Sequence, residues 1–216
     1  MAVIKETDGR FRRSAATREK IIAATISLIR EGQVAPTSEM IALRAGVSAR
    51  SIFFRFKDTA DLYLTVIDHV IAEFLPKLPP MPTFGPSALR LRLFVDRRAR
   101  SGEEFRHFWR TGLVLFSDHP AITARGDMVR MITRTRIATA FEPELAALAP
   151  ERRESLIDAI ATACDWEVWD MMRRYLGRSI DEAKATLFTL VSGALLSHGV
   201  AIEDATNDAW APVAAE

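Results

Sequence analysis

The side chains best suited to chemistry stand between residues 37 and 57, where hydroxyl groups and cations occur at short intervals among apolar residues. Hydroxyl, ammonium and guanidinium groups are the side-chain donors that hold phosphate oxygens. The segment therefore predicts contact with a phosphate-bearing polyanion. The candidate phosphate contacts are Thr37, Ser38, Ser48, Arg55 and Lys57.

A second chemically suggestive spacing is the pair Glu104 and His107, since di-iron helical bundles use Glu-x-x-His twice, together with two further Glu ligands. The sequence contains no second copy of this pair. It also lacks His-Glu-x-x-His, Gly-x-Ser-x-Gly and a glycine-rich phosphate loop. The single cysteine, Cys164, forms neither an internal disulfide nor a multi-thiolate metal site. We therefore expect no enzyme activity, cofactor or metal, and a helical-bundle metalloenzyme is the least favoured alternative.

Short helices must position the hydroxyl and basic side chains of residues 37–57. Apolar residues recur at steps of three and four, which predicts helices over residues 17–32, 37–45, 49–54 and 59–73. We expect Thr17 to cap the first helix, and Gly32 to end it in the left-handed conformation. Thr37 and Ser48 are suited to cap the second and third helices, because their hydroxyls accept from free backbone amides.

The turn at Gly46 and Val47 joins the second and third helices into a helix-turn-helix, in which small residues allow the two helices to cross steeply. The second helix of this motif lies in the DNA major groove with its N-terminal residues at base edges. Arg50 is the candidate for reading a base, because two N–H groups of its guanidinium can donate to guanine O6 and N7. The side chains expected on the exposed face are Ser48, Ala49, Arg50, Ser51 and Phe54.

Residues 17–67 resemble the DNA-binding domain of the TetR family of transcriptional repressors. The positions that carry the resemblance match the family pattern without a gap; they are Arg18, Ile21, Ile22, Thr37, Ile41, Ala42, Ala45 to Ser48, Ile52 to Phe54, Phe56, Lys57 and Leu62. Four positions depart from the pattern, the first being Ser38, which stands where an aliphatic residue is common. Phe53 stands where the family usually has a Tyr that reaches a phosphate, Arg55 replaces a His, and Thr59 replaces a Lys.

The charge is distributed unevenly along the chain. Residues 1–57 contain eleven Lys or Arg against five Asp or Glu, a net charge of +6, whereas the whole chain carries +1. Such an asymmetry predicts a polyanion partner for the N-terminal quarter. Residues 1–16 form a basic arm that either adds electrostatic affinity, or enters a minor groove, or is a solvated tail. The arginines assigned to this basic arm are Arg10, Arg12, Arg13 and Arg18.

Five of the ten prolines cluster in residues 76–86, where no regular helix is expected. We therefore divide the chain into a helix-turn-helix domain at 1–75 (motif 37–56), a linker at 76–86 and a helical domain at 87–216. In this last domain we expect short helices near 89–95 and 103–117, then longer ones over 120–141 and 151–176, and a final helix that begins at Ser179 or Asp181. The predicted fold class is all-α, with about nine to ten helices.

The resemblance implies a C-terminal domain that binds a small effector and forms a homodimer. The two helix-turn-helix domains of the dimer then bind the two half-sites of a palindromic double-stranded DNA, about 34–36 Å apart. The final helix carries Thr189, Gly193 and Ser197 four residues apart, which allows close approach in a homodimer. We expect a largely apolar or aromatic effector, and ordinary core packing is the competing interpretation of each candidate pocket residue. The candidates are His107, Trp109, Arg110, Phe116, Met128, Met131, Asp165, Trp166, Trp169 and Met172.

The composition, 49% hydrophobic and 26% charged, is that of a globular chain, and the N-terminus shows no apolar segment of a secretory signal. We expect a cytoplasmic protein. Residues 185–202 carry no formal charge, but their polar and glycine residues favour a buried helix over a membrane span. The function expected is a ligand-responsive transcriptional regulator, most simply a repressor. The alternative is a DNA-binding regulator or architectural factor without an effector.

Overall fold

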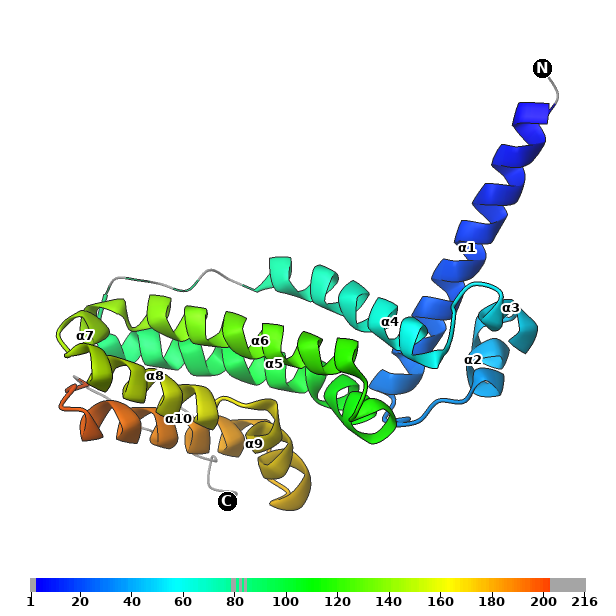
Figure 1. Cartoon of the computed structure of the whole chain (residues 1–216). Coiled ribbons are helices and arrows are strands. Elements are labelled where there is room, and N and C mark those ends of the chain that lie inside the picture. Colours follow the sequence, from blue (N-terminus) through cyan, green and yellow to red (C-terminus); the bar gives the residue numbers. More distant parts are fainter. Residues whose placement is uncertain (1–2, 79–80, 82, 84, 203–216) are drawn as a thin grey trace. The chain divides into compact units, whose positions relative to one another are not determined.

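A computed structural model describes residues 3–78, 81, 83 and 85–202, with side chains from residue 14 onward (Figure 1). Throughout these residues the regular structure is helical, and no strand occurs among them. The prediction of an all-α fold is confirmed. The chain divides into two compact units. The N-terminal unit comprises the chain through Lys77 together with His107–Ala124, and the C-terminal unit comprises Leu78–Arg106 and the chain from Arg125 onward.

The first helix, α1 (Val3–Arg30), begins much earlier than expected. Thr17 is an interior residue of α1, so its predicted role as the cap is wrong. Residues 3–16 contain no proline, and the Asp8–Gly9 pair, which is typical of turns, does not interrupt the helix. The predicted end is confirmed, because Gly32 adopts φ +91° just after the helix. The side chains of Arg10, Arg12 and Arg13 lie outside the described residues.

The second and third helices agree with the sequence prediction. Helix α2 (Ser38–Ala45) begins after Thr37, whose hydroxyl accepts from the Met40 amide at 3.3 Å. It ends at Gly46, which is left-handed at φ +64°. Helix α3 (Ala49–Phe53) begins after Ser48, whose hydroxyl accepts from the Ser51 amide at 3.3 Å. Both caps satisfy backbone donors that a helix leaves free at its N-terminus.

Helix α4 (Thr59–Phe74) confirms the fourth prediction and continues into a 3₁₀ turn, η1 (Leu75–Lys77). α1 packs against both α2 and α4. The core of the N-terminal unit is aliphatic, with Phe56 beneath the end of the helix-turn-helix. Its most deeply buried members include Ile21, Ile22, Ile29, Ile41, Ile52, Phe56, Leu62, Val66, Ile67 and Val70.

Helix α5 (Ser87–Phe116) is a single 30-residue helix, so the prediction of two short helices was wrong. No proline interrupts the chain between the two predicted segments, the Ser101 hydroxyl donates to the Arg97 carbonyl of the same helix, and Gly102 continues the helix. A Cβ atom at Gly102 would lie 2.6 Å from the Trp169 ring. The glycine thus allows α5 and the segment that carries Trp169 to approach closely. Residues 107–116 of α5 belong to the N-terminal unit.

The predicted helix over 151–176 is also interrupted. Helix α8 (Pro150–Ala163) ends at Cys164, and α9 (Trp166–Asp170) starts after Asp165, followed by a π-helical turn, η2 (Met171–Tyr175). Asp165 stabilises the break, because its carboxylate accepts from the Glu167 amide at 3.1 Å and pairs with Arg130 at 3.0 Å. Periodicity alone does not reveal such a tertiary contact.

Helices α6 (Pro120–Ala140) and α10 (Ile180–Ser197) follow the prediction. The short α7 (Glu142–Ala146) was not expected; it begins with Pro143 in its first turn, where proline is tolerated. Ser179 and Glu182 form a reciprocal capping box that starts α10. In the C-terminal unit α10 packs along α8, over a core that also includes Phe94, Ile137 and Phe141. Within the described residues, no helix is long and apolar enough to span a membrane.

Candidate nucleic-acid interface

The turn between α2 and α3 is held by hydrogen bonds within the motif itself. The amides of Gly46 and Val47 donate to carbonyls of the last turn of α2, the Val47 amide to Ala42 at 3.0 Å. The Ser48 and Ser51 hydroxyls lie 2.9 Å apart at the start of α3. Since these contacts are local, the α2–turn–α3 geometry follows directly from the Gly-Val-Ser sequence.

Helix α3 presents an exposed surface of mixed chemistry. The Arg50 side chain is exposed and makes no side-chain interaction with another described residue. Phe53 and Phe54 are 59% and 82% exposed, which is unusual for large apolar side chains. Ile52 points the other way and is buried. The short helix therefore has one face in the core and one face available to a partner.

The other predicted contacts surround this face with different degrees of exposure. Thr37, Ser48 and Lys57 are exposed, whereas Ser38, Ala49 and Ser51 are partly buried. The Lys57 amide donates to Asp61 at 3.0 Å, and Asp58 caps α4 through the Asp61 amide at 2.8 Å. These bonds fix the backbone at Lys57 and leave its side chain exposed.

Arg55 and Arg18 make internal contacts. The Arg55 guanidinium donates to the carbonyls of Ser14 at 3.3 Å and Ser51 at 3.2 Å, which connects the end of α3 to α1. Arg18, which the sequence analysis assigned to the basic arm, stacks over Phe56 at 4.9 Å and donates to Thr65 at 3.3 Å. The hydrogen bond to Thr65 thus holds α1 against α4.

Sequence reasoning missed the contact that orients α2 on α1. Arg44 donates to both carboxylate oxygens of Glu31, at 2.6 and 2.8 Å, and to the Ser27 hydroxyl at 2.6 Å. The hydrogen bond from Arg44, supported by that from Ser27, lowers the pKa of Glu31 from its ordinary 4.5 to about 2. Glu31 lies thirteen positions before Arg44, so no helical spacing reveals the pair.

The residues proposed from sequence to line an effector pocket are divided between the two units. His107, Trp109, Arg110 and Phe116 belong to the N-terminal unit, where Phe116 lies against the Tyr63 ring at 5.3 Å. The others belong to the C-terminal unit.

In that unit Trp169 and Met172 are buried core residues, and the Trp169 indole donates to Glu103 at 2.9 Å. Asp165 is the cap of α9, and Trp166 and Met128 are partly buried. Met131 is 68% exposed. Core packing and capping thus account for Trp169, Met172 and Asp165.

The rival pair Glu104 and His107 lies on α5. In the part of the chain that is described, no group of three or more His, Cys, Asp or Glu side chains is arranged to hold a metal ion.

No protein-family model and no curated protein sequence matches this chain. The fold does resemble a crystal structure of a transcriptional regulator from Rhodococcus sp. Rha1, with a TM-score of 0.66. The match covers 83% of this chain and 96% of that chain, at 15% sequence identity. At this identity the likeness establishes a shared all-α fold.

Proposed function

We propose that this chain is a DNA-binding transcriptional regulator of the TetR kind. The observation that carries the proposal is the α2–turn–α3 motif, which is capped by Thr37 and Ser48 and exposes Arg50, Phe53 and Phe54 on α3. The net charge of +6 on residues 1–57 favours a polyanion at this surface. The resemblance of fold to a transcriptional regulator supports the same function.

In this proposal α3 enters the major groove and Arg50 reads a guanine through its two N–H donors. The exposed Phe53 and Phe54 rings supply apolar contact, of the kind that thymine methyl groups accept. Thr37, Ser38, Lys57 and one hydroxyl of the Ser48–Ser51 pair donate to phosphates. Ala49, at the start of α3, lies close to the DNA backbone. Arg55 keeps its hydrogen bonds to the Ser14 and Ser51 carbonyls, and its remaining N–H groups donate to a DNA phosphate.

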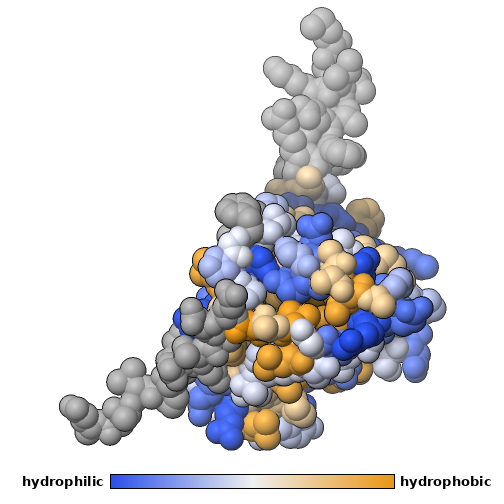
Figure 2. Space-filling model, turned by 90° about the vertical axis from the view of Figure 1, so that its left-hand side faces the viewer, coloured by the Kyte–Doolittle hydropathy of each residue, from blue (hydrophilic) through white to orange (hydrophobic). Residues whose placement is uncertain are grey.

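We propose that two chains pair through α8 and α10. α10 exposes Thr189, Gly193 and Ser197, and a Cβ atom at Gly193 would meet nothing within 4 Å. The same helix exposes Leu190 and Leu196. Hydrophobic side chains are also visible among hydrophilic ones on the surface in Figure 2. A homodimer with two helix-turn-helix motifs requires a palindromic operator.

The proposed effect of DNA binding is repression, relieved when a small effector binds the C-terminal unit. A ligand releases DNA only by binding the DNA-free conformation more tightly than the DNA-bound one. An architectural factor without an effector shares the DNA contacts but not this response.

The test is selection of bound duplexes from a random pool by the purified full chain, at one stated salt concentration. We expect the recovered sequences to share a palindrome that two chains occupy together. Recovery of unrelated sequences, with affinity that depends on salt alone, would instead favour the architectural role. No retention of duplex at low salt would refute DNA binding.

A further inference from the structure

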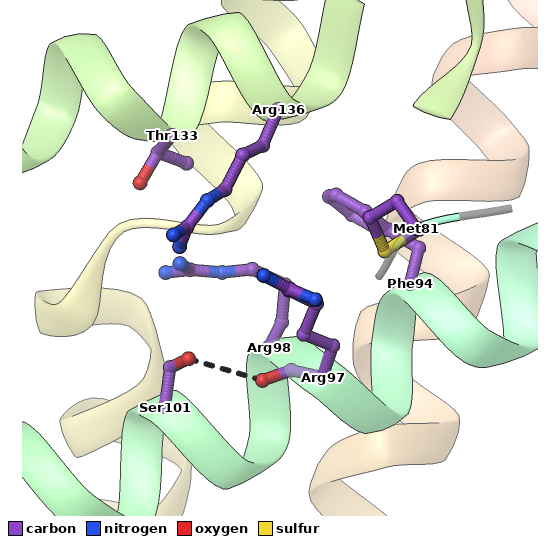
Figure 3. Close-up of a pocket in the computed structure, with 7 residues that line it drawn as sticks. All are labelled: Met81, Phe94, Arg97, Arg98, Ser101, Thr133 and Arg136. Atoms are coloured by element: carbon purple, nitrogen blue, oxygen red, sulfur yellow. Dashed lines mark hydrogen bonds between the residues drawn. The ribbon is translucent and has the colours of Figure 1, made fainter. Parts of the chain in front are cut away.

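The C-terminal unit contains a small pocket between α5 and α6 in which three arginine side chains converge (Figure 3). The lining residues come from α5, from α6 and from the segment that precedes α5. They are Phe94, Arg97, Arg98 and Ser101, then Thr133 and Arg136, and finally Met81. None of them was among the pocket residues expected from sequence.

The three positive charges have no carboxylate partner among the described residues. Arg98 donates to the Cys164 carbonyl, which fixes its guanidinium. The Nε and Nη1 atoms of Arg97 and the Nε of Arg98 are buried without a hydrogen-bond partner. Burial, and then the charge of Arg98, lowers the pKa of Arg97; burial, and then Arg97 and Arg98, lowers the pKa of Arg136. Since arginine stays protonated, the site holds concentrated positive charge.

Several other arginines of the same unit are paired with carboxylates. Arg134 pairs with Glu154 at 2.9 Å and with Asp158, and Arg173 pairs with Glu103 at 2.7 Å. The pocket arginines differ from these in lacking a carboxylate, which a bound anion would supply.

The hydroxyl groups at the rim are already engaged. Ser101 donates to the Arg97 carbonyl at 3.1 Å, and Thr133 donates to the Val129 carbonyl at 3.0 Å. Neither has a proton left for a ligand, so recognition depends on the guanidinium groups. Phe94 is buried and, with Met81, makes one side of the pocket apolar.

We propose that this pocket binds a small oxyanion, with a carboxylate or phosphate group on the three guanidiniums. Guanidinium forks match both oxyanions in planar, bidentate geometry. Anion binding here does not require DNA binding; only the role of the anion as an effector rests on the proposed function.

The test uses the full chain without DNA, in phosphate-free buffer at constant ionic strength. Inorganic phosphate, benzoate and its uncharged analogue benzamide are titrated while the melting temperature and the heat of binding are recorded. We expect both anions to raise the melting temperature and benzamide to leave it unchanged. Equal effects of benzoate and benzamide, or no effect of either anion, would overturn the proposal.

The variants are Arg97→Gln and Arg136→Gln, with Arg100→Gln as the matched control, since Arg100 is an exposed arginine on the same helix. We expect each pocket variant to weaken anion binding about tenfold or more, because each removes a charge-assisted donor. The control should bind like the parent chain.

The melting temperature without ligand separates binding from a structural role. Removing one of three like charges should leave that temperature unchanged or raise it. A lower melting temperature in both pocket variants, or an equal loss of binding in Arg100→Gln, would contradict the proposal. Failure of this experiment leaves DNA binding untouched, and failure of duplex selection leaves the anion site untouched.

Discussion

Arginine plays different parts in the two units. On α3 of the N-terminal unit, Arg50 is exposed and unpaired, while Arg44 nearby is held by Glu31. In the C-terminal unit, Arg97 and Arg136 are partly buried and unpaired, while Arg90, with a side chain 5% exposed, is paired with Glu144. Each unit therefore contains arginines whose ion pairs stabilise the fold and arginines without a carboxylate partner.

An arginine without a carboxylate partner indicates a binding site when it is buried, but not when it is exposed. Water solvates an exposed guanidinium, so the absence of a partner for Arg50 costs little and says little by itself. The DNA proposal therefore rests on the motif around Arg50. A buried guanidinium loses its hydrating water, and a hydrogen-bonding or oppositely charged partner must replace that water. The lack of a carboxylate at Arg97 and Arg136 is therefore a signal in its own right.

The largest effect should come from breaking a paired, buried arginine. Glu144→Ala leaves Arg90 buried without its carboxylate, and loss of one partner of a buried pair costs about 3–5 kcal/mol. Urea denaturation measures the free energy of unfolding, with Glu142→Ala as the exposed control on the same short helix. If Glu144→Ala were no more destabilising than Glu142→Ala, the contrast between paired and unpaired buried arginines would fail.

Arg50→Ala tests the exposed counterpart. We expect it to weaken binding to a selected palindrome by about 1–3 kcal/mol while random duplex binds almost as before, because a base contact carries discrimination. Titration of both duplexes by fluorescence anisotropy measures the difference. An equal loss on both would mean that Arg50 contacts phosphate.

Lys57→Ala should have a smaller and less selective effect. Loss of one phosphate contact weakens all duplexes alike and reduces the slope of log K against log salt by about 1. The measurement is a salt series on selected and random duplex. Lys77→Ala, an exposed lysine beyond α4, is the control and should leave the slope unchanged.

The smallest effect concerns the exposed Arg44–Glu31 pair. Because the folded-state pKa of Glu31 is lowered from 4.5 to about 2, its charged form stabilises the fold above pH 4.5, and this contribution is lost as the pH falls toward 2. Glu31→Gln should therefore melt slightly below the parent chain at neutral pH, and the two should converge between pH 4.5 and 2. A difference that persists unchanged at pH 2 would mean that the pair does not act through charge.

Local signals in the sequence predicted most of the N-terminal unit. Gly32, Thr37, Gly46 and Ser48 act on their own backbone neighbourhood, so each was recognisable without knowledge of the fold. The start of α1 was misplaced because Thr17 is a residue type that can cap a helix but here lies inside one.

The C-terminal unit was less predictable because its breaks and its pocket depend on distant residues. Asp165 interrupts the helical pattern through Arg130, thirty-five positions earlier. The pocket joins α5 to α6 and is likewise invisible to local patterns. A partial signal was present, because Arg97 and Ser101 share a helical face with the core residue Phe94.

Whether α3 reads sequence is measured most directly by the affinity ratio between the selected palindrome and a shuffled duplex of equal composition, at one salt concentration. We expect a ratio of about 10³ or more, with two chains per palindrome. A ratio near one, with both duplexes equally sensitive to salt, would contradict sequence reading by α3.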